Sequence, residues 1–175
     1  FKWIKQGRLA LGYRDYKSVG VHEICEEIQT ASAEQGSPFD VVILDYATAL
    51  HYSGKAERWD AVRSIYETLR ATAAKLKCVI WTGHHAKNQR PLKGFYDQEH
   101  AVDAKSISNI IDLGVSINMD DWSAQTGRST FYIFKSRMGG LHNTVDFRTE
   151  WARSIVKETS ANSRISDRMK GTPIL

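Results

Sequence analysis

The sequence has few cysteines and no long apolar run, and these two absences narrow the kinds of protein it can be. No apolar run approaches the roughly 20 residues that a membrane-spanning helix needs, and no secretory signal opens the chain. Neither Cys25 nor Cys78 has a nearby metal-ligand partner, so we expect two buried free thiols, which suit a reducing cytoplasm. The chain begins with Phe1 rather than Met, and we therefore expect a fragment or a processed product.

The rest of the composition is that of a globular domain. Hydrophobic residues make up 42% of the chain and charged residues 25%, so its 175 residues suffice for one domain with a hydrophobic core. The formal net charge is +4, and the segment from Trp151 onward supplies most of it. Such a charge is compatible with nucleic-acid binding, but solubility alone also explains it.

Apolar runs that alternate with helical periodicities predict an α/β domain with a largely parallel sheet. We expect a short strand at residues 8–14, followed by a helix that Ser18 caps and that ends at Gly36. The run at residues 39–45 is apolar and rich in β-branched side chains, which predicts a strand buried on both faces.

A long amphipathic helix is predicted at residues 57–77. Its apolar stripe consists of Trp59, Val62, Ile65, Tyr66, Leu69, Ala73 and Leu76. The later elements that we expect are, in order, a buried strand at 78–82, a polar stretch at 83–103, a short helix at 104–111, a strand around 113–117, strands at 130–135 and 144–148 joined by a turn with Gly139 and Gly140, and a polar tail from Lys157.

An acidic residue, Asp45, ends the first apolar strand. In open α/β sheets, ligands bind at the carboxyl ends of strands. An acid there has the form of a Walker B motif, whose carboxylate holds Mg²⁺ through water while the metal bridges nucleotide phosphates. A second interpretation stays open, in which Asp45 only caps the loop that follows.

Two adjacent histidines, His84 and His85, follow the second apolar strand. If this strand lies beside the first, a histidine here could hydrogen-bond a γ-phosphate or orient water. Adjacent side chains on an extended chain point to opposite sides, so chelation of one metal ion by the pair is disfavoured. Histidines that simply face solvent are the remaining alternative.

Two cations, Lys135 and Arg137, alternate along the end of a late strand and can face one way. Together they could neutralise phosphate charge, and the planar fork of arginine is suited to bidentate contacts. Without further context, two solvated basic residues are an equally simple interpretation.

The long polar stretch interleaves basic and aromatic residues. Its cations are Lys87, Arg90, Lys93 and Lys105, with Phe95 and Tyr96 between them. This pattern suits single-stranded nucleic acid, because cations follow the phosphates and rings stack on bases. Neighbouring acids partly cancel the charge, so an ordinary polar surface loop stays open as an alternative.

Taken in order, these segments resemble the second half of the motor domain of DnaB-family replicative helicases, the phage versions especially. The family pattern is a strand ending in Asp-Tyr, a long helix, a strand ending in a polar sensor, a DNA-contacting loop and a Lys-x-Arg strand. In this chain the corresponding segments are residues 41–46, the helix from Glu57, Gly83-His84-His85, the loop at 85–105, and Lys135-Ser136-Arg137. The resemblance covers roughly residues 8–156, including the stretch Gly12-Tyr13-Arg14-Asp15-Tyr16.

The resemblance implies an α/β fold with a RecA-like P-loop NTPase core. Its mostly parallel sheet would be flanked by helices and followed by C-terminal antiparallel strands. Residues 1–156 would form the C-terminal part of this motor domain, and residues 157–175 a polar, flexible tail.

The resemblance also implies roles for single residues, with ATP and Mg²⁺ as cofactors. Asp45 matches the Walker B acid, and either His84 or His85 matches the γ-phosphate sensor. Lys135 and Arg137 match the pair that reaches the ATP of the neighbouring subunit.

The chain departs from the family pattern at two places. It contains no G-x-x-x-x-G-K-[ST] loop, so that loop and the catalytic glutamate are expected upstream, and this chain alone should not hydrolyse ATP. The segment before Ala104 lacks the Arg-Glu pair of bacterial members, although Lys105 lies where the family contacts the DNA backbone.

The first hypothesis is therefore an ATP-dependent 5′–3′ DNA helicase, phage-encoded or phage-like, that forms a homo-hexameric ring on single-stranded DNA. Its expected partners include a primase and a helicase loader, and its expected location is the cytoplasm of a bacterial or phage-infected cell. A second hypothesis is another RecA-fold ATPase, KaiC-like or recombinase-like. A third is a non-catalytic RecA-like DNA-binding module.

Overall fold

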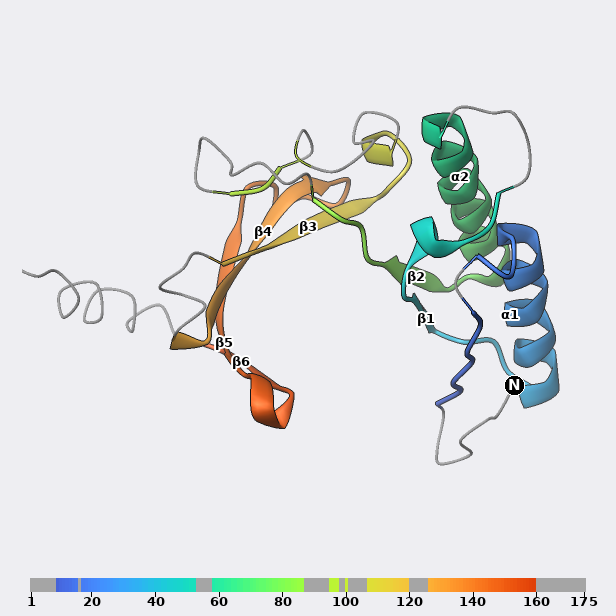
Figure 1. Ribbon diagram of the computed structural model, residues 1–175, viewed down its shortest axis with the longest axis horizontal. Coiled ribbons are helices and arrows are strands. Elements are labelled where there is room, and N and C mark those ends of the chain that lie inside the picture. The colour runs from blue at the N-terminus through green and yellow to red at the C-terminus, as the bar shows by residue number, and fades with distance from the viewer. Residues whose placement is uncertain are drawn as a thin grey trace, which may run out of the picture. The chain divides into compact units, whose positions relative to one another are not determined.

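The computed structural model describes residues 9–15, 17–52, 58–86, 95–97, 100, 107–119 and 126–159. The chain divides into two compact units, Phe1–His85 and Ala86–Leu175. The first unit holds two helices and a small parallel sheet, and the second holds a four-stranded antiparallel sheet (Figure 1). Each unit is described by itself.

Helix α1 spans Val21–Gln35 and opens the first unit. Its predicted end is confirmed, because Gly36 adopts a left-handed conformation with φ of 73° that closes the last turn. The predicted cap, Ser18, is wrong. Gly20 is the N-cap instead, and its backbone N–H donates to the Glu23 carboxylate at 2.6 Å, while the Ser18 hydroxyl donates to the carbonyl of Asp15.

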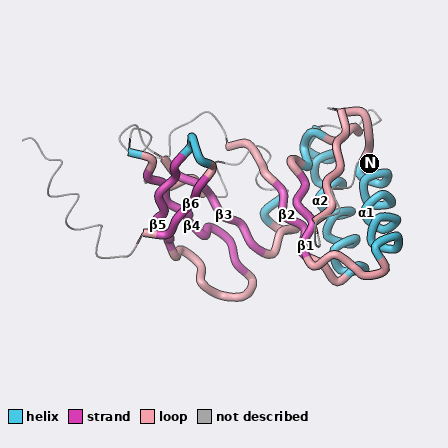
Figure 2. Tube along the Cα trace, turned by 90° about the horizontal axis from the view of Figure 1, so that it is seen from below, coloured by secondary structure: helices cyan, strands magenta, loops and turns pink. Residues whose placement is uncertain are grey.

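Strands β1 (Val41–Leu44) and β2 (Val79–Thr82) pair in parallel. Both strands were expected to be buried on both faces, and this prediction is wrong. Alternate side chains are exposed, among them Ile43 at 79% and Trp81 at 45%. The reason is that α1 and α2 lie on the same face of this sheet (Figures 1 and 2), so only that face packs against apolar side chains.

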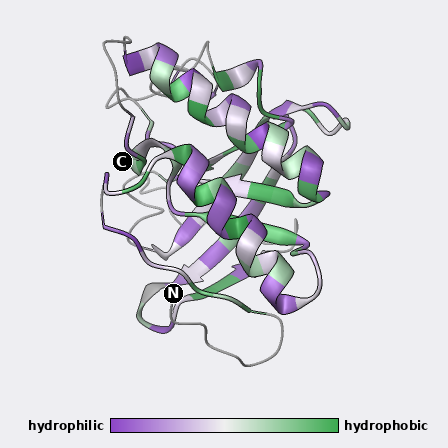
Figure 3. Cartoon of the chain, turned by 90° about the vertical axis from the view of Figure 1, so that its right-hand side faces the viewer, coloured by the Kyte–Doolittle hydropathy of each residue, from purple (hydrophilic) through white to green (hydrophobic). Residues whose placement is uncertain are grey.

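Helix α2 spans Arg58–Leu76 and supplies most of the core of the first unit. Val62, Ile65 and Leu69 are each at most 4% exposed, and burying such side chains stabilises a fold by about 1.5–3 kcal/mol each. The predicted stripe is therefore confirmed at its centre, whereas Trp59 at its start is 43% exposed. Hydrophobic strand residues lie behind the two helices in Figure 3.

The strand predicted at residues 8–14 is not formed in the described part, residues 9–15. A strand needs a neighbour to accept and donate its backbone hydrogen bonds, and here pairing with a neighbour begins only at Lys17, whose N–H donates to the carbonyl of Ala49. The segment is held instead by Arg14, which contacts Glu27 of α1 through Nε at 2.9 Å and Nη2 at 2.5 Å.

The second unit is a meander of four strands in the order β3-β4-β5-β6. Their bounds are Leu113–Asn118, Arg128–Ser136, Thr144–Glu150 and Ile155–Glu158, with a short 3-10 turn at Trp151–Arg153 before the last strand. Between β4 and β5, Phe131 and Phe147 pack with ring centroids 4.0 Å apart, and Phe147 is buried. These neighbouring aromatic rings anchor one face of the sheet.

The predicted α/β class and the C-terminal antiparallel strands are confirmed, but a mostly parallel sheet is not. Among the described strands only β1 and β2 are parallel, because β3 to β6 follow one another through short turns that permit only antiparallel pairing. Strand β6 includes Lys157 and Glu158, which were expected to begin the tail. Residues 160–175 and part of the helix expected at 104–111 lie outside the described residues.

Candidate functional site

The carboxylate of Asp45 stands at the carboxyl end of β1, immediately after Leu44. Leu44 pairs with Thr82, the last residue of β2, so the two strands end at the same edge of the sheet. The expectation that the polar segment after β2 lies beside Asp45 is therefore confirmed as geometry. Asp45 is exposed, which leaves its carboxylate accessible to a ligand.

The ends of β1 and β2 are joined by specific contacts. The backbone N–H of Ala47 donates to the Thr82 hydroxyl oxygen at 2.8 Å. Gly83 passes so close to Tyr46 that a Cβ on the glycine would lie 3.7 Å from the tyrosine Cβ. These contacts fix the backbone on both sides of Asp45, because Ala47 follows it by two residues and is fully buried.

The two adjacent histidines take up different environments. His84 is half-buried, and its Nδ1 lies 3.1 Å from the hydroxyl of Tyr66 on α2. His85 is exposed, and its ring meets that of Tyr46 edge-on with centroids 4.9 Å apart. The structure thus separates two residues that the sequence could not rank, because only His84 has a hydrogen bond from the helical layer that fixes its ring.

Tyr66 is a residue of this site that sequence reasoning missed. Its spacing placed it in the apolar stripe of α2, and it is indeed buried, with 6% of its surface exposed. Burial raises the pKa of its phenol to about 12, so the hydroxyl keeps its proton near neutral pH. The signal that could have identified it is a tyrosine where an apolar residue would suffice, since a buried tyrosine hydroxyl requires a partner.

The donor set fits a magnesium ion bound together with a nucleotide better than it fits a metal held by protein alone. Among the described residues no three His, Cys, Asp or Glu side chains gather as a metal-binding group. Mg²⁺ typically uses one or two carboxylates, and water and substrate phosphates complete its coordination. The single exposed carboxylate of Asp45 is of this kind.

Lys135 and Arg137 belong to the second unit. Lys135 lies near the end of β4, opposite Gly114 of β3. Arg137 follows the last strand residue, Ser136, and its guanidinium contacts Asp112 at 3.2 Å and the carbonyl of Asn109 at 2.7 Å. Arg137 is therefore held in place by the segment before β3, although 41% of its side chain is exposed.

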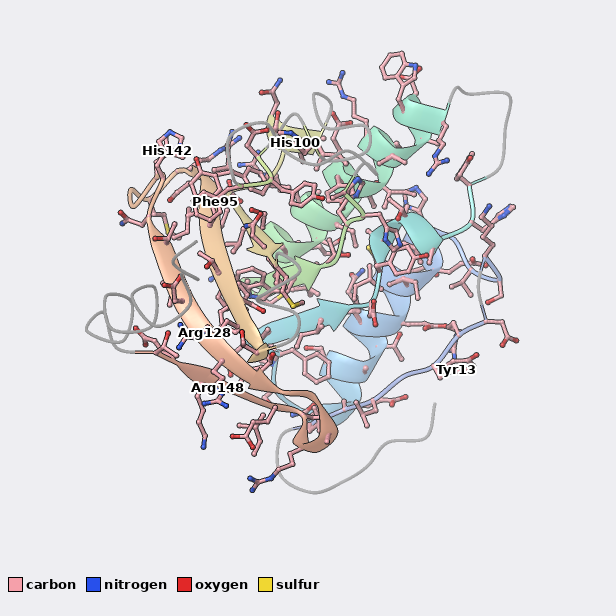
Figure 4. All side chains as sticks on the ribbon, turned by 60° about the vertical axis from the view of Figure 1, so that its left-hand side comes forward. Tyr13, Phe95, His100, Arg128, His142 and Arg148 are labelled. Carbon is pink, nitrogen blue, oxygen red and sulfur yellow. The ribbon has the colours of Figure 1, made fainter. Side chains whose placement is uncertain are left out.

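The cations proposed for nucleic-acid contact, Lys87, Arg90, Lys93 and Lys105, lie outside the described residues. The described part of this loop rests on the second unit's sheet. The Phe95 ring stacks on Tyr132 of β4 at 5.0 Å between centroids, and the N–H of Tyr96 donates to the Asn118 side chain at 2.7 Å. Phe95 lies near His142, and Arg128 and Arg148 lie farther along the same hairpin (Figure 4).

Both predicted free thiols are confirmed. Cys25 is buried and Cys78 is half-buried, and neither forms a disulfide. Burial raises the pKa of both thiols, which keeps them protonated and slow to react. None of the described helices has the length and apolar character needed to cross a membrane.

Comparison with known proteins shows what this fold resembles. No protein-family model and no curated protein sequence matches the chain. Among solved structures, the ATPase domain of a DnaB-like helicase superimposes on 81% of this chain with a TM-score of 0.72 and 15% identity. A second DnaB-like replicative helicase, whose structure was reported together with its interactions with primase, superimposes on 76% with a TM-score of 0.68 and 16% identity.

The chain accounts for only part of each of these proteins. It spans 52% of the first of these chains, the ATPase domain, and 34% of the second, the helicase described with primase. The structural match to helicase ATPase domains extends over most of the present chain, and it shows that the chain has their fold.

Proposed function

We propose that this chain is part of the motor domain of an ATP-driven replicative DNA helicase. The observation that carries the proposal is the match of most of the chain to two helicase ATPase domains, with an exposed aspartate and a polar sensor at one edge of β1 and β2. In the full protein, six copies would form a ring on single-stranded DNA and move along it in the 5′–3′ direction.

In the proposed mechanism, Asp45 binds a water-coordinated Mg²⁺ at the carboxyl end of β1. The metal, when bound, neutralises charge on the β- and γ-phosphates of ATP. The contacts of Ala47 and Gly83 on either side keep the aspartate at this strand end. The phosphate-binding loop and the catalytic glutamate would come from residues outside this chain.

His84 is the proposed γ-phosphate sensor. It follows β2 on the same sheet edge as Asp45, and its ring is fixed by Tyr66, whereas His85 packs against Tyr46 and faces solvent. A sensor must report the presence of the γ-phosphate through one defined contact, and a ring fixed in one orientation meets this requirement better than an exposed ring.

Arg137, assisted by Lys135, would act on ATP held by a neighbouring subunit. Its guanidinium now contacts Asp112 at the surface of the second unit. A surface ion pair of this kind contributes about 0–1 kcal/mol, so exchanging Asp112 for a phosphate costs little. Lys87, Arg90, Lys93 and Lys105 would contact the DNA backbone.

The proposed assembly also has partners. The DnaB-like helicase that this chain resembles was described with primase, and we extend that partner, together with a helicase loader, to the full protein as a proposal. The location that fits these partners is the cytoplasm of a bacterial or phage-infected cell.

The test of the proposed function compares two aspartates on one strand. Asp40 is exposed at the amino end of β1, and Asp45 is exposed at its carboxyl end. In the full-length protein, Asp45→Asn should abolish ATP hydrolysis while Asp40→Asn leaves it intact, and neither should lower the melting temperature by more than a few degrees. Equal ATPase rates in the two variants would remove the Walker B role.

A further inference from the structure

The contact between Tyr66 and His84 joins α2 to the end of β2 within the first unit. The tyrosine hydroxyl oxygen lies 3.1 Å from Nδ1 of the histidine, and the two rings meet at 68° with centroids 6.1 Å apart. Tyr66 is buried and belongs to the central part of the longest described helix, so its position is set by the core. His84 follows a strand end, where its ring has more freedom.

The direction of this hydrogen bond follows from the needs of the buried hydroxyl. With its pKa raised to about 12, the phenol of Tyr66 carries its hydrogen near neutral pH. A buried O–H without an acceptor is costly, and among the described residues Nδ1 of His84 is the partner found for this group. If Nδ1 carried a hydrogen and donated it, the tyrosine hydrogen would lack an acceptor there. The tyrosine therefore donates to the lone pair of Nδ1.

A neutral imidazole that accepts at Nδ1 carries its hydrogen on Nε2. The ring nitrogen that does not face Tyr66 is thus a donor, which suits a phosphate oxygen. The other tautomer would present a lone pair to the same oxygen, and two acceptors repel. The choice of tautomer therefore decides whether the histidine can bind a γ-phosphate without being protonated.

We infer that Tyr66 is a positioning residue, which holds His84 in the tautomer that donates from Nε2 and fixes its ring for contact with the γ-phosphate. This inference rests on the proposed function. It assigns to the helical layer a part in nucleotide sensing, through one hydroxyl group. It also explains why His84 rather than His85 serves as the sensor, since the contact of His85 with Tyr46 is a ring contact that leaves its tautomer unconstrained.

The experiment removes only this hydroxyl from the full-length protein. Tyr66→Phe should lower the kcat for ATP hydrolysis by about 2- to 10-fold, the range expected for one hydrogen bond. The matched control is Tyr13→Phe, because Tyr13 is 80% exposed (Figure 4) and loses the same atom without loss of a buried contact. Tyr13→Phe should retain the wild-type kcat.

A double-mutant cycle separates positioning of the histidine from general support of the fold. In a His84→Ala background, Tyr66→Phe should cause no further fall in kcat, because its effect acts through the imidazole. An equal fold-change in both backgrounds would overturn the inference, and so would a Tyr66→Phe variant with wild-type kcat. Thermal melting of each variant checks that the proteins compared are folded.

Failure of the inference and failure of the proposed function give different results. If Asp45→Asn is inactive and Tyr66→Phe behaves as wild type, only the positioning role is wrong. If Asp45→Asn and His84→Ala both hydrolyse ATP at the wild-type rate, the proposed site itself is wrong.

Discussion

Replacing Arg137 by alanine tests whether this residue acts across a subunit interface. In well-studied NTPases, an arginine that reaches the γ-phosphate in the transition state is worth about 10³- to 10⁵-fold in rate. Arg137→Ala in the full-length protein should therefore reduce kcat by at least about 10³-fold. Arg148→Ala is the matched control, because Arg148 is exposed on β5 of the same hairpin and has no proposed role.

The contact with Asp112 sharpens this prediction. Arg137 and Asp112 are 41% and 54% exposed, so their ion pair is screened by solvent and holds the arginine with about 0–1 kcal/mol. Asp112→Asn should therefore leave kcat unchanged or raise it, by about 5-fold at most. A structural arginine would give the opposite pattern, in which Arg137→Ala and Asp112→Asn cause similar losses.

The assay is ATP turnover in mixed rings. One inactive protein carries Asp45→Asn and the other carries Arg137→Ala, and some interfaces of a mixed ring combine an intact Asp45 site with an intact Arg137 of its neighbour. Partial recovery of turnover on mixing is the expected result. Mixed rings that form but never regain turnover would refute action across the interface, and full activity of Arg137→Ala alone would refute any role in hydrolysis.

Two further predictions concern the loop and the sheet of the second unit. If Lys93 and Lys105 contact phosphates, alanine at either position should weaken binding to single-stranded DNA of any sequence and reduce the slope of log K against log salt by about 0.7; unchanged slopes in both variants would make the loop ordinary surface. Gly127→Ala should lower the melting temperature more than Gly36→Ala, because both glycines have positive φ but only at Gly127 would the new Cβ meet a backbone oxygen, at 2.3 Å. Equal shifts in the two variants would mean that the contact relaxes.

Local patterns predicted the elements whose stability is local. The helix from Arg58 to Leu76 was predicted to within one residue at each end, because its apolar stripe and its charged face repeat at helical spacing. The end of α1 at Gly36 was equally clear, since glycine is suited to the left-handed turn found there.

Elements that depend on distant partners were predicted less well. The apolar runs of β1 and β2 indicated burial on both faces, but a sequence run does not show which face another layer covers. The strand expected at 8–14 failed for the same reason, because backbone pairing depends on a neighbouring strand. Strand β6 was missed because Ile155–Glu158 is short and half polar.

The candidate site divides along the same line. Asp45 could be identified because an acid after an apolar strand is visible in the sequence. The distinction between His84 and His85 could not, since it depends on Tyr66, which is 18 residues away on another element. The role of Arg137 was inferred from position, whereas its contact with Asp112 appears only in the structure.

The central claim is tested most directly by strand displacement with the full-length protein on a forked DNA substrate. The account predicts that ATP drives separation of the strands, that a non-hydrolysable ATP analogue does not, and that Asp45→Asn abolishes separation while Asp40→Asn retains it. Hydrolysis of ATP without strand separation would contradict the helicase function and favour another RecA-fold ATPase. DNA binding with neither hydrolysis nor separation would contradict the motor altogether and favour a non-catalytic module.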